Sequence, residues 1–147
     1  MKKRRITRIG SGFTMVELMA VLIILGLLMT VVVGNFVGGV DKARKKTTQT
    51  NLKLLHQAVN RFKMDTGRFP TEDEGLTVLV DQPSDVEGWE PGGYLNTTDI
   101  PVDGWGNEFF YEPYPESGKP FVIISYGADG EEGGEEYDAD LYSTDAN

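Results

Sequence analysis

The chain has 147 residues, a formal net charge of −9 and no cysteine. This length suffices for one small domain, the acidic excess argues against nucleic acid as the main partner, and the missing cysteines exclude a disulfide staple. The only histidine, His56, lies within a helical pattern, and neither a cysteine nucleophile nor a GxSxG motif is present. The sequence therefore gives no indication of an enzyme.

Residues 1–40 combine a basic cluster with a long apolar run. The cluster precedes Gly12 and consists of Lys2, Lys3, Arg4, Arg5 and Arg8. After Glu17 the next charged residue is Asp41, and the 23 residues between them would span about 34 Å as a helix, enough for a bilayer core of about 30 Å. By the positive-inside rule, we expect the cluster in the cytoplasm and the acidic remainder of the chain across the membrane.

Three interpretations of this N-terminal region differ in what they explain. A cleaved secretory signal has a shorter apolar stretch and a small-residue cleavage site such as A-x-A, which is missing here. A plain uncleaved anchor fits the length but leaves Glu17 unexplained, unless this residue is simply solvated at the membrane edge. A carboxylate in an apolar span usually marks function and needs a partner, which favours a third interpretation.

The segment "GFTMVEL", residues 12–18, resembles the class III signal of type IV pilins and pseudopilins. The resemblance implies that a prepilin peptidase cuts after Gly12 and that the new N-terminal Phe13 is methylated. The hydrophobic helix is then kept and packs in the core of a filament. There the positive α-amino group of Phe13 can meet Glu17 of a neighbouring subunit, a pairing that would set register rather than bulk stability.

A helical period continues beyond the apolar run, although Gly34, Asn35, Gly38 and Gly39 weaken the helix there. Residues 41–65 are predicted to form an amphipathic helix, since apolar or small side chains recur at three- and four-residue steps. The expected buried stripe is Val40, Ala43, Thr47, Asn51, Leu55, Val59 and Phe62, widened by Leu52, Leu54 and Ala58. Gly67 should end the helix, and Pro70 forbids its continuation. One long helix over about 13–64 is therefore expected.

The remainder of the chain predicts short elements around this helix. "TEDE", residues 71–74, has the pattern of a capping box, and a short helix should follow it in "GLTVLVDQ". Residues 83–107 are rich in Gly, Pro, Asp and Asn and are predicted to be a loop. "EFFYEPYP" and "KPFVIISYG" predict two strands joined by a turn at "ESG", with apolar faces that cover the helix.

Several motifs beyond the helix resemble the major pseudopilins of type II secretion systems: "TGRFPT", "EGL", "GGYL", "DGWGN" and "SYGADGEEGGEEYDAD". The resemblance runs from Gly12 to Leu141. This chain has Gly104 where the family usually has proline, and Tyr126 where it usually has leucine. Type IV pilins proper typically close their C-terminal region with a disulfide, so the absence of cysteine favours a pseudopilin.

The resemblance implies an α+β, pilin-like, lollipop-shaped fold. One long N-terminal helix, its first half transmembrane, would pack on a small antiparallel sheet that carries a C-terminal calcium loop. The expected parts are a removed cytoplasmic leader (1–12), a transmembrane and filament-core helix (13–40) and a periplasmic head (41–147). Within the head we expect the amphipathic helix (41–65), a loop with a short helix (66–107), and the strands with the calcium loop (108–147).

The C-terminal loop is dense in acidic residues and glycine. Its acidic side chains are Asp129, Glu131, Glu132, Glu135, Glu136, Asp138 and Asp140. Calcium takes six to eight oxygen ligands from carboxylates and carbonyls, whereas the spacing does not match an EF-hand. Composition alone leaves open a solvated acidic tail that binds nothing. The resemblance implies a Ca²⁺ site with ligands from Asp129, Asp138, Asp140 and the carbonyl of Tyr126.

In function, the resemblance implies a structural subunit of the periplasmic pseudopilus, which helps to drive folded proteins across the outer membrane. Its partners would be neighbouring copies, the prepilin peptidase, minor pseudopilins and the inner-membrane assembly platform. The chain would cross the inner membrane once, with its head in the periplasm. Alternatives are an adhesion or DNA-uptake fibre and an anchored calcium-binding domain without a polymer. Beyond Arg68 only Lys119 is basic, which argues against DNA.

Overall fold

The computed structural model describes residues 12–145, with the backbone alone over 30–38. The predicted leader and its basic cluster therefore lie almost entirely outside the described residues. The chain divides into two compact units, Met1–Gly38 and Gly39–Asn147. The elements in chain order are α1 (Met15–Thr66), η1 (Thr77–Leu79), β1 (Phe110–Pro113), β2 (Phe121–Ser125) and β3 (Leu141–Tyr142).

In the first unit, α1 begins directly after a capping threonine. The hydroxyl of Thr14 accepts the backbone N–H of Glu17 at 3.2 Å, and the carbonyl of Thr14 accepts the N–H of Leu18 at 3.1 Å. Every described side chain from Phe13 to Met29 is exposed. No helix among the described residues combines the length and the apolar character that crossing a bilayer requires. The transmembrane segment stays a prediction.

In the second unit, the C-terminal half of α1 carries the buried stripe. The prediction is confirmed for Leu52, Leu55, Ala58, Val59 and Phe62. It is wrong for four other members, which are exposed: Val40, Ala43, Thr47 and Leu54. The buried threonine is Thr48, fully enclosed, because it lies one turn before Leu52 on the core-facing side of the helix.

The end of α1 and the turn after it follow the predicted signals. Gly67 has φ +79°, a left-handed conformation that suits glycine, and its N–H bonds to the carbonyl of Lys63 at 3.0 Å. Thr71 and Glu74 form the predicted capping box. The N–H of Thr71 donates to Glu74 at 2.8 Å, and the N–H of Glu74 donates to the Thr71 hydroxyl at 3.4 Å. The helix that follows is only the three-residue 3₁₀ turn η1.

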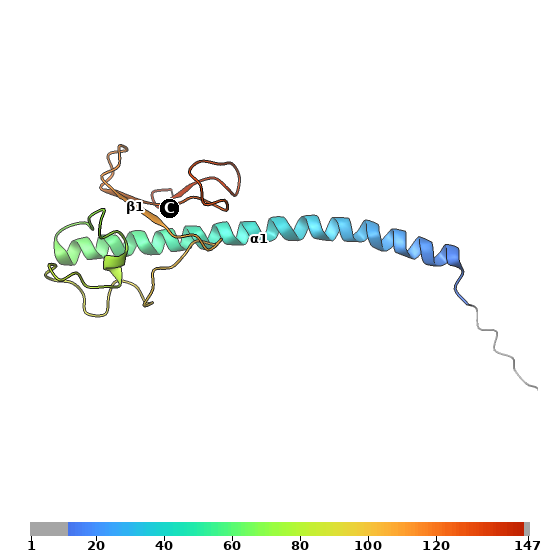
Figure 1. Cartoon of the computed structure of the whole chain (residues 1–147), viewed down its shortest axis with the longest axis horizontal. Helices are drawn as coiled ribbons and strands as arrows, with labels where there is room; N and C mark the ends of the chain where they lie inside the picture. The colour runs from blue at the N-terminus through green and yellow to red at the C-terminus, as the bar shows by residue number, and fades with distance from the viewer. Residues whose placement is uncertain (1–11, 146–147) are drawn as a thin grey trace, which may run out of the picture. The chain divides into compact units, whose positions relative to one another are not determined.

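The two predicted strands form an antiparallel pair, β1 and β2, in which Phe110 lies opposite Ile124 and Pro113 opposite Phe121. A third strand, β3, pairs antiparallel with β2 and was not predicted, because two residues are too short to show an alternating pattern. The sheet order is β1-β2-β3. In Figure 1 the strands lie on one side of the C-terminal half of α1, and most of the 66–107 segment lies on the other.

The core joins these elements into one cluster. Buried residues of α1 pack with Phe121 and Ile123 of β2, with Phe109 beside β1, and with Val78 and Leu79 of η1. β2 is buried along its whole length. This confirms the α+β class with a long N-terminal helix and an antiparallel sheet, while the calcium loop in the same prediction stays a prediction.

Candidate functional site

The predicted processing site lies just before α1. Gly12 is open, since a Cβ placed there would meet no atom within 4 Å, and Phe13 is 81% exposed. Glu17 is the acidic residue of the first helical turn, where the positive end of the helix dipole favours a carboxylate. The sequence interpretation missed the cap at Thr14, although Thr14 and Glu17 have the same T-x-x-E spacing as Thr71 and Glu74.

The acidic loop, residues 126–140, connects two adjacent strands. Ser125 at the end of β2 lies opposite Leu141 at the start of β3, so the two ends of the loop are held side by side. Within the loop three backbone hydrogen bonds close the chain on itself: Ala128 N–H to Tyr137 at 2.9 Å, Asp138 N–H to Glu135 at 3.0 Å and Asp140 N–H to Gly133 at 3.2 Å. The loop is thus a closed structure and not an extended tail.

Two glycines allow the loop to close tightly around Asp138. Gly127 (φ +67°) and Gly134 (φ +78°) both have left-handed backbones, and a Cβ on either would come within about 2.6 Å of backbone atoms of Asp138. Neither position could therefore carry a side chain without moving the loop. Gly130 (φ +71°) and Gly133 (φ +107°) also have left-handed backbones, but a Cβ on either would meet no atom closer than 3.6 Å.

The predicted ligand residues lie in this loop with different partners. An oxygen of Asp129 accepts the N–H of Glu131 at 3.1 Å. Both oxygens of Asp140 accept the N–H of Gly133, at 3.1 and 3.2 Å, and Tyr142 donates its hydroxyl to one of them at 3.1 Å. The ring of Tyr126 packs on Phe110 with centroids 4.6 Å apart. Across residues 12–145, no three Asp, Glu or His side chains are grouped so that they could hold a metal ion.

A buried carboxylate anchors the first end of the loop, and the sequence interpretation missed it. Asp103 is 4% exposed and accepts three hydrogen bonds: from Trp105 N–H at 2.9 Å, Asn107 N–H at 2.8 Å and the Ser125 hydroxyl at 2.7 Å. The amide of Asn107 in turn donates to the carbonyl of Gly127 at 2.9 Å. The "DGWGN" spacing could have indicated the local turn, since Asp often accepts the N–H two residues on.

A second contact ties the loop to α1. The ammonium group of Lys45 donates to the backbone carbonyl of Glu136 at 3.4 Å. Glu136 has φ +57°, which is uncommon for a residue with a side chain and marks a locally strained turn. Both contacts end on backbone carbonyls of the loop, so neither of them uses one of its acidic side chains.

Comparisons with known proteins agree with this architecture. The family model described as type II secretion system (T2SS), protein G matches residues 35–144. The type II secretion system core protein G of Pseudomonas aeruginosa is 37% identical over 138 residues, 92% of this chain and 95% of that protein. The protein of the same description from Vibrio cholerae is 38% identical over 133 residues, 89% of each chain.

A solved structure is similar in fold. It is the crystal structure of the major pseudopilin from the type 2 secretion system of enterohaemorrhagic Escherichia coli, with a TM-score of 0.61 and 26% identity. The similarity covers 74% of this chain and 92% of that one. The family model and the relatives each cover well over half of the sequence. The chain therefore belongs to the type II secretion system protein G family, the major pseudopilins.

Proposed function

We propose that this chain is a structural subunit that polymerises into the periplasmic pseudopilus of a type II secretion system. The observation that carries the proposal is the 37% identity to a type II secretion system core protein G over 92% of the chain. The family is structural, so the chain is a building block and not an enzyme. Its partners are other copies, the prepilin peptidase, the minor pseudopilins and the inner-membrane assembly platform.

Processing and anchoring follow from the N-terminal sequence. We infer cleavage after Gly12, supported by the open surroundings of this glycine and the exposure of Phe13. From the sequence alone, we infer that the uncharged run from Leu18 to Val40 would hold the chain in the inner membrane before assembly, with the acidic head in the periplasm. In the filament, Glu17 neutralises the α-amino group of Phe13 on an adjoining copy.

We further propose that the acidic loop binds one calcium ion. The donor chemistry fits, because calcium prefers carboxylate and carbonyl oxygens and tolerates irregular geometry. The backbone closure around Asp138 and the anchoring by Asp103 support a preformed loop. Asp129, Asp138, Asp140 and the carbonyl of Tyr126 would hold the ion. These three carboxylates are not grouped around one point among the described residues, so binding would have to draw them together, with carbonyl oxygens completing the shell.

Secretion by a strain that lacks its own copy of the subunit tests the function. The intact chain should restore release of a folded exoprotein into the medium. Glu17→Ala should not restore it, since the amine of Phe13 then lacks its counter-charge. Asp41→Ala is the matched control, because it removes one carboxylate just beyond the apolar run and should leave secretion unchanged. Full secretion in the strain without any subunit would contradict the proposal.

A further inference from the structure

The head carries a cleft of about 430 Å³ between α1 and the C-terminal strand region. Residues of α1 form one wall, and Lys119, Phe121 and Ser143 contribute to the other. The α1 residues that line it are Lys53, His56, Gln57 and Asn60. The cleft shares no residue with the acidic loop, residues 126–140. Neither processing nor the calcium proposal uses these residues.

The cleft is basic on a head that is otherwise strongly acidic. In residues 41–147 acidic side chains outnumber basic ones by more than two to one. Lys53 and Lys119 are exposed, and neither forms an ion pair with any other described residue. Arg44, Arg61 and Arg68 each have a carboxylate partner within the chain, whereas the other lysines of the head form no ion pair among the described residues either: Lys42, Lys45, Lys46 and Lys63. Two unpaired ammonium groups at one cleft attract an anion from outside the chain.

His56 adds a fixed donor to the same cleft. Its Nδ1 lies 3.2 Å from the hydroxyl of Ser143, and its ring packs on Phe121 with centroids 4.7 Å apart. The Ser143 oxygen also accepts the N–H of Ile123 at 3.0 Å, and we assign the hydrogen of the Ser143–His56 bond to the serine, so that Nδ1 is the acceptor. Burial lowers the pKa of His56 from its ordinary value, which favours the neutral ring. A neutral ring that accepts at Nδ1 carries its hydrogen on Nε2, where it can donate to an incoming oxygen.

The acidic loop of the same chain carries exposed negative charges that complement the unpaired lysines of the cleft. Four glutamates of the acidic loop are exposed, and none forms an ion pair within residues 12–145: Glu131, Glu132, Glu135 and Glu136. Lys45 contacts the loop only at the backbone carbonyl of Glu136. These four side chains are also distinct from the proposed calcium ligands. They can therefore bind a basic cleft while the loop holds its ion.

We propose that the cleft of one copy binds the glutamates of the acidic loop of a second copy. The inference rests on the proposed polymer and names one of its subunit contacts. Two different patches that are complementary to each other give a head-to-tail contact, which extends into an open chain when the rotation between copies does not close a ring. Charge complementarity of this kind fixes orientation and register more than it adds affinity.

Crosslinking in assembled filaments tests this contact directly, because the natural chain has no cysteine. Two full-length variants are expressed together, one with Gln57→Cys and the other with a cysteine at one of the four glutamates. Gln57 is exposed, uncharged and lines the cleft, so its replacement leaves the charges intact. A short bis-maleimide is added to the sheared filaments. The matched control replaces the Gln57 variant with Thr98→Cys, an exposed site outside the cleft.

We expect a crosslinked dimer from Gln57→Cys paired with at least one of the four glutamate positions, and none from the Thr98 control. Adding Lys53→Gln and Lys119→Gln to the cleft variant should reduce the dimer about fivefold or more, whereas Arg61→Gln should not. If filaments form but no crosslinked dimer appears at any of the four positions, the proposed contact is wrong and the proposed polymerisation is unaffected. If the yield of crosslinked dimer is unchanged by the two lysine replacements, the contact does not depend on charge. If the natural chain forms no filaments at all, the proposed function is wrong, and the proposed contact is wrong with it.

Discussion

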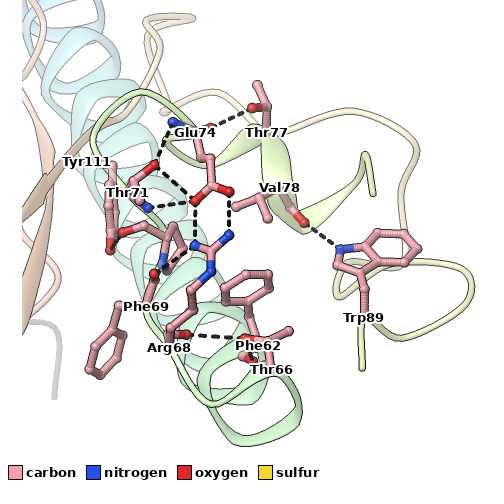
Figure 2. A network of polar contacts seen from close by, with 11 residues as sticks. Phe62, Thr66, Arg68, Phe69, Thr71, Glu74, Thr77, Val78, Trp89 and Tyr111 are labelled. Atoms are coloured by element: carbon pink, nitrogen blue, oxygen red, sulfur yellow. Dashed lines mark hydrogen bonds and ion pairs between the residues drawn. The ribbon is translucent and has the colours of Figure 1, made fainter. Parts of the chain in front are cut away.

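Arg68 and Glu74 are joined by two parallel hydrogen bonds, from Nη1 to Oε2 at 2.7 Å and from Nη2 to Oε1 at 2.6 Å. The same carboxylate accepts the N–H of Thr71 at 2.8 Å, so one side chain both caps a turn and holds the arginine, as Figure 2 shows. The guanidinium of Arg68 is the main reason that the pKa of Glu74 falls to about 2, and the bonds from Thr71 add to the effect. The pair fixes the chain where it leaves α1.

Glu74 should make stability depend on pH in a defined window. A carboxyl pKa that is lowered on folding contributes stability that is complete above the ordinary value of 4.5 and is lost as the pH falls towards 2. We expect Glu74→Gln to lower stability by about 1 kcal/mol at pH 7, since Arg68 is partly exposed and solvent screens the pair. Thermal melts from pH 2 to 7 check this.

The exposed Glu72→Gln is the control and should leave the melting curve unchanged. The variant Glu74→Gln should also flatten the decline between pH 4.5 and 2. If its pH profile instead follows that of the natural chain, the pair has no measurable role.

Thr48 and Gly104 form a second contact that can be tested by substitution. The Thr48 hydroxyl accepts the N–H of Gly104 at 2.8 Å and donates to the carbonyl of Arg44 at 3.0 Å. Thr48→Val keeps the volume and removes both bonds, which should cost about 1–3 kcal/mol of unfolding free energy. Thr48→Ser keeps the hydroxyl and should retain more stability. Equal stability of the two variants in denaturant titrations would show that the hydroxyl does not matter.

The same contact bears on the proline that the pseudopilin resemblance implies in place of Gly104. A Cβ at this position would collide with the carbonyl of Arg44. Proline would also remove the N–H that Thr48 accepts. We expect Gly104→Pro to destabilise this chain, although it restores the usual residue.

The sequence predicted the elements whose signals are local. Gly67 ends α1, Thr71 and Glu74 form the capping box, and the long apolar runs around β1 and β2 become strands. The helical spacing to Leu52 and Leu55 favours Thr48 over Thr47, but the predicted stripe ran through Asn51 and therefore included Thr47. β3 could not be predicted, because its two residues form a strand only by pairing with the distant strand β2.

The candidate loop was predictable in composition but not in geometry. Glycines and carboxylates can be read from the sequence, whereas the hydrogen bonds of Asp129 and Asp140 depend on which backbone N–H groups the loop turns towards them. The local turn at Asp103 can be read from "DGWGN", whereas its bond to Ser125, 22 residues away, depends on the fold.

Asp103 should be essential for the stability of the head. Asp103→Ala leaves two backbone N–H groups and the Ser125 hydroxyl without an acceptor in a buried site, at about 1–3 kcal/mol for each unsatisfied group. Asp103→Asn should cost much less, because its oxygen can still accept the two N–H groups while its amide donates to Ser125. Chemical denaturation of both variants measures the difference, and equal losses would contradict the hydrogen-bond argument.

Calcium should stabilise the head, residues 41–147, which contains the whole core. A ligand that binds only the folded state at a hundredfold excess over its Kd adds about 2.7 kcal/mol. We therefore expect the melting temperature to fall with a chelator and to recover with added calcium, but only poorly with magnesium, which requires a smaller octahedral shell. Asp129→Ala and Asp138→Ala should mimic chelation.

Glu108→Gln is the control for that experiment, since this exposed carboxylate lies outside the loop. A melting temperature that responds to neither chelator nor calcium would show that the loop is a solvated acidic segment.

The intact mass of the subunit in sheared filaments tests the proposed function most directly. The measurement identifies the polymerised species and its N-terminus at once. We expect the chain in the filament fraction with a mass that begins at Phe13 and includes one added methyl group. A mass that begins at Met1 or near Gly34, or absence of the chain from the filaments, would contradict assembly by the pseudopilin route.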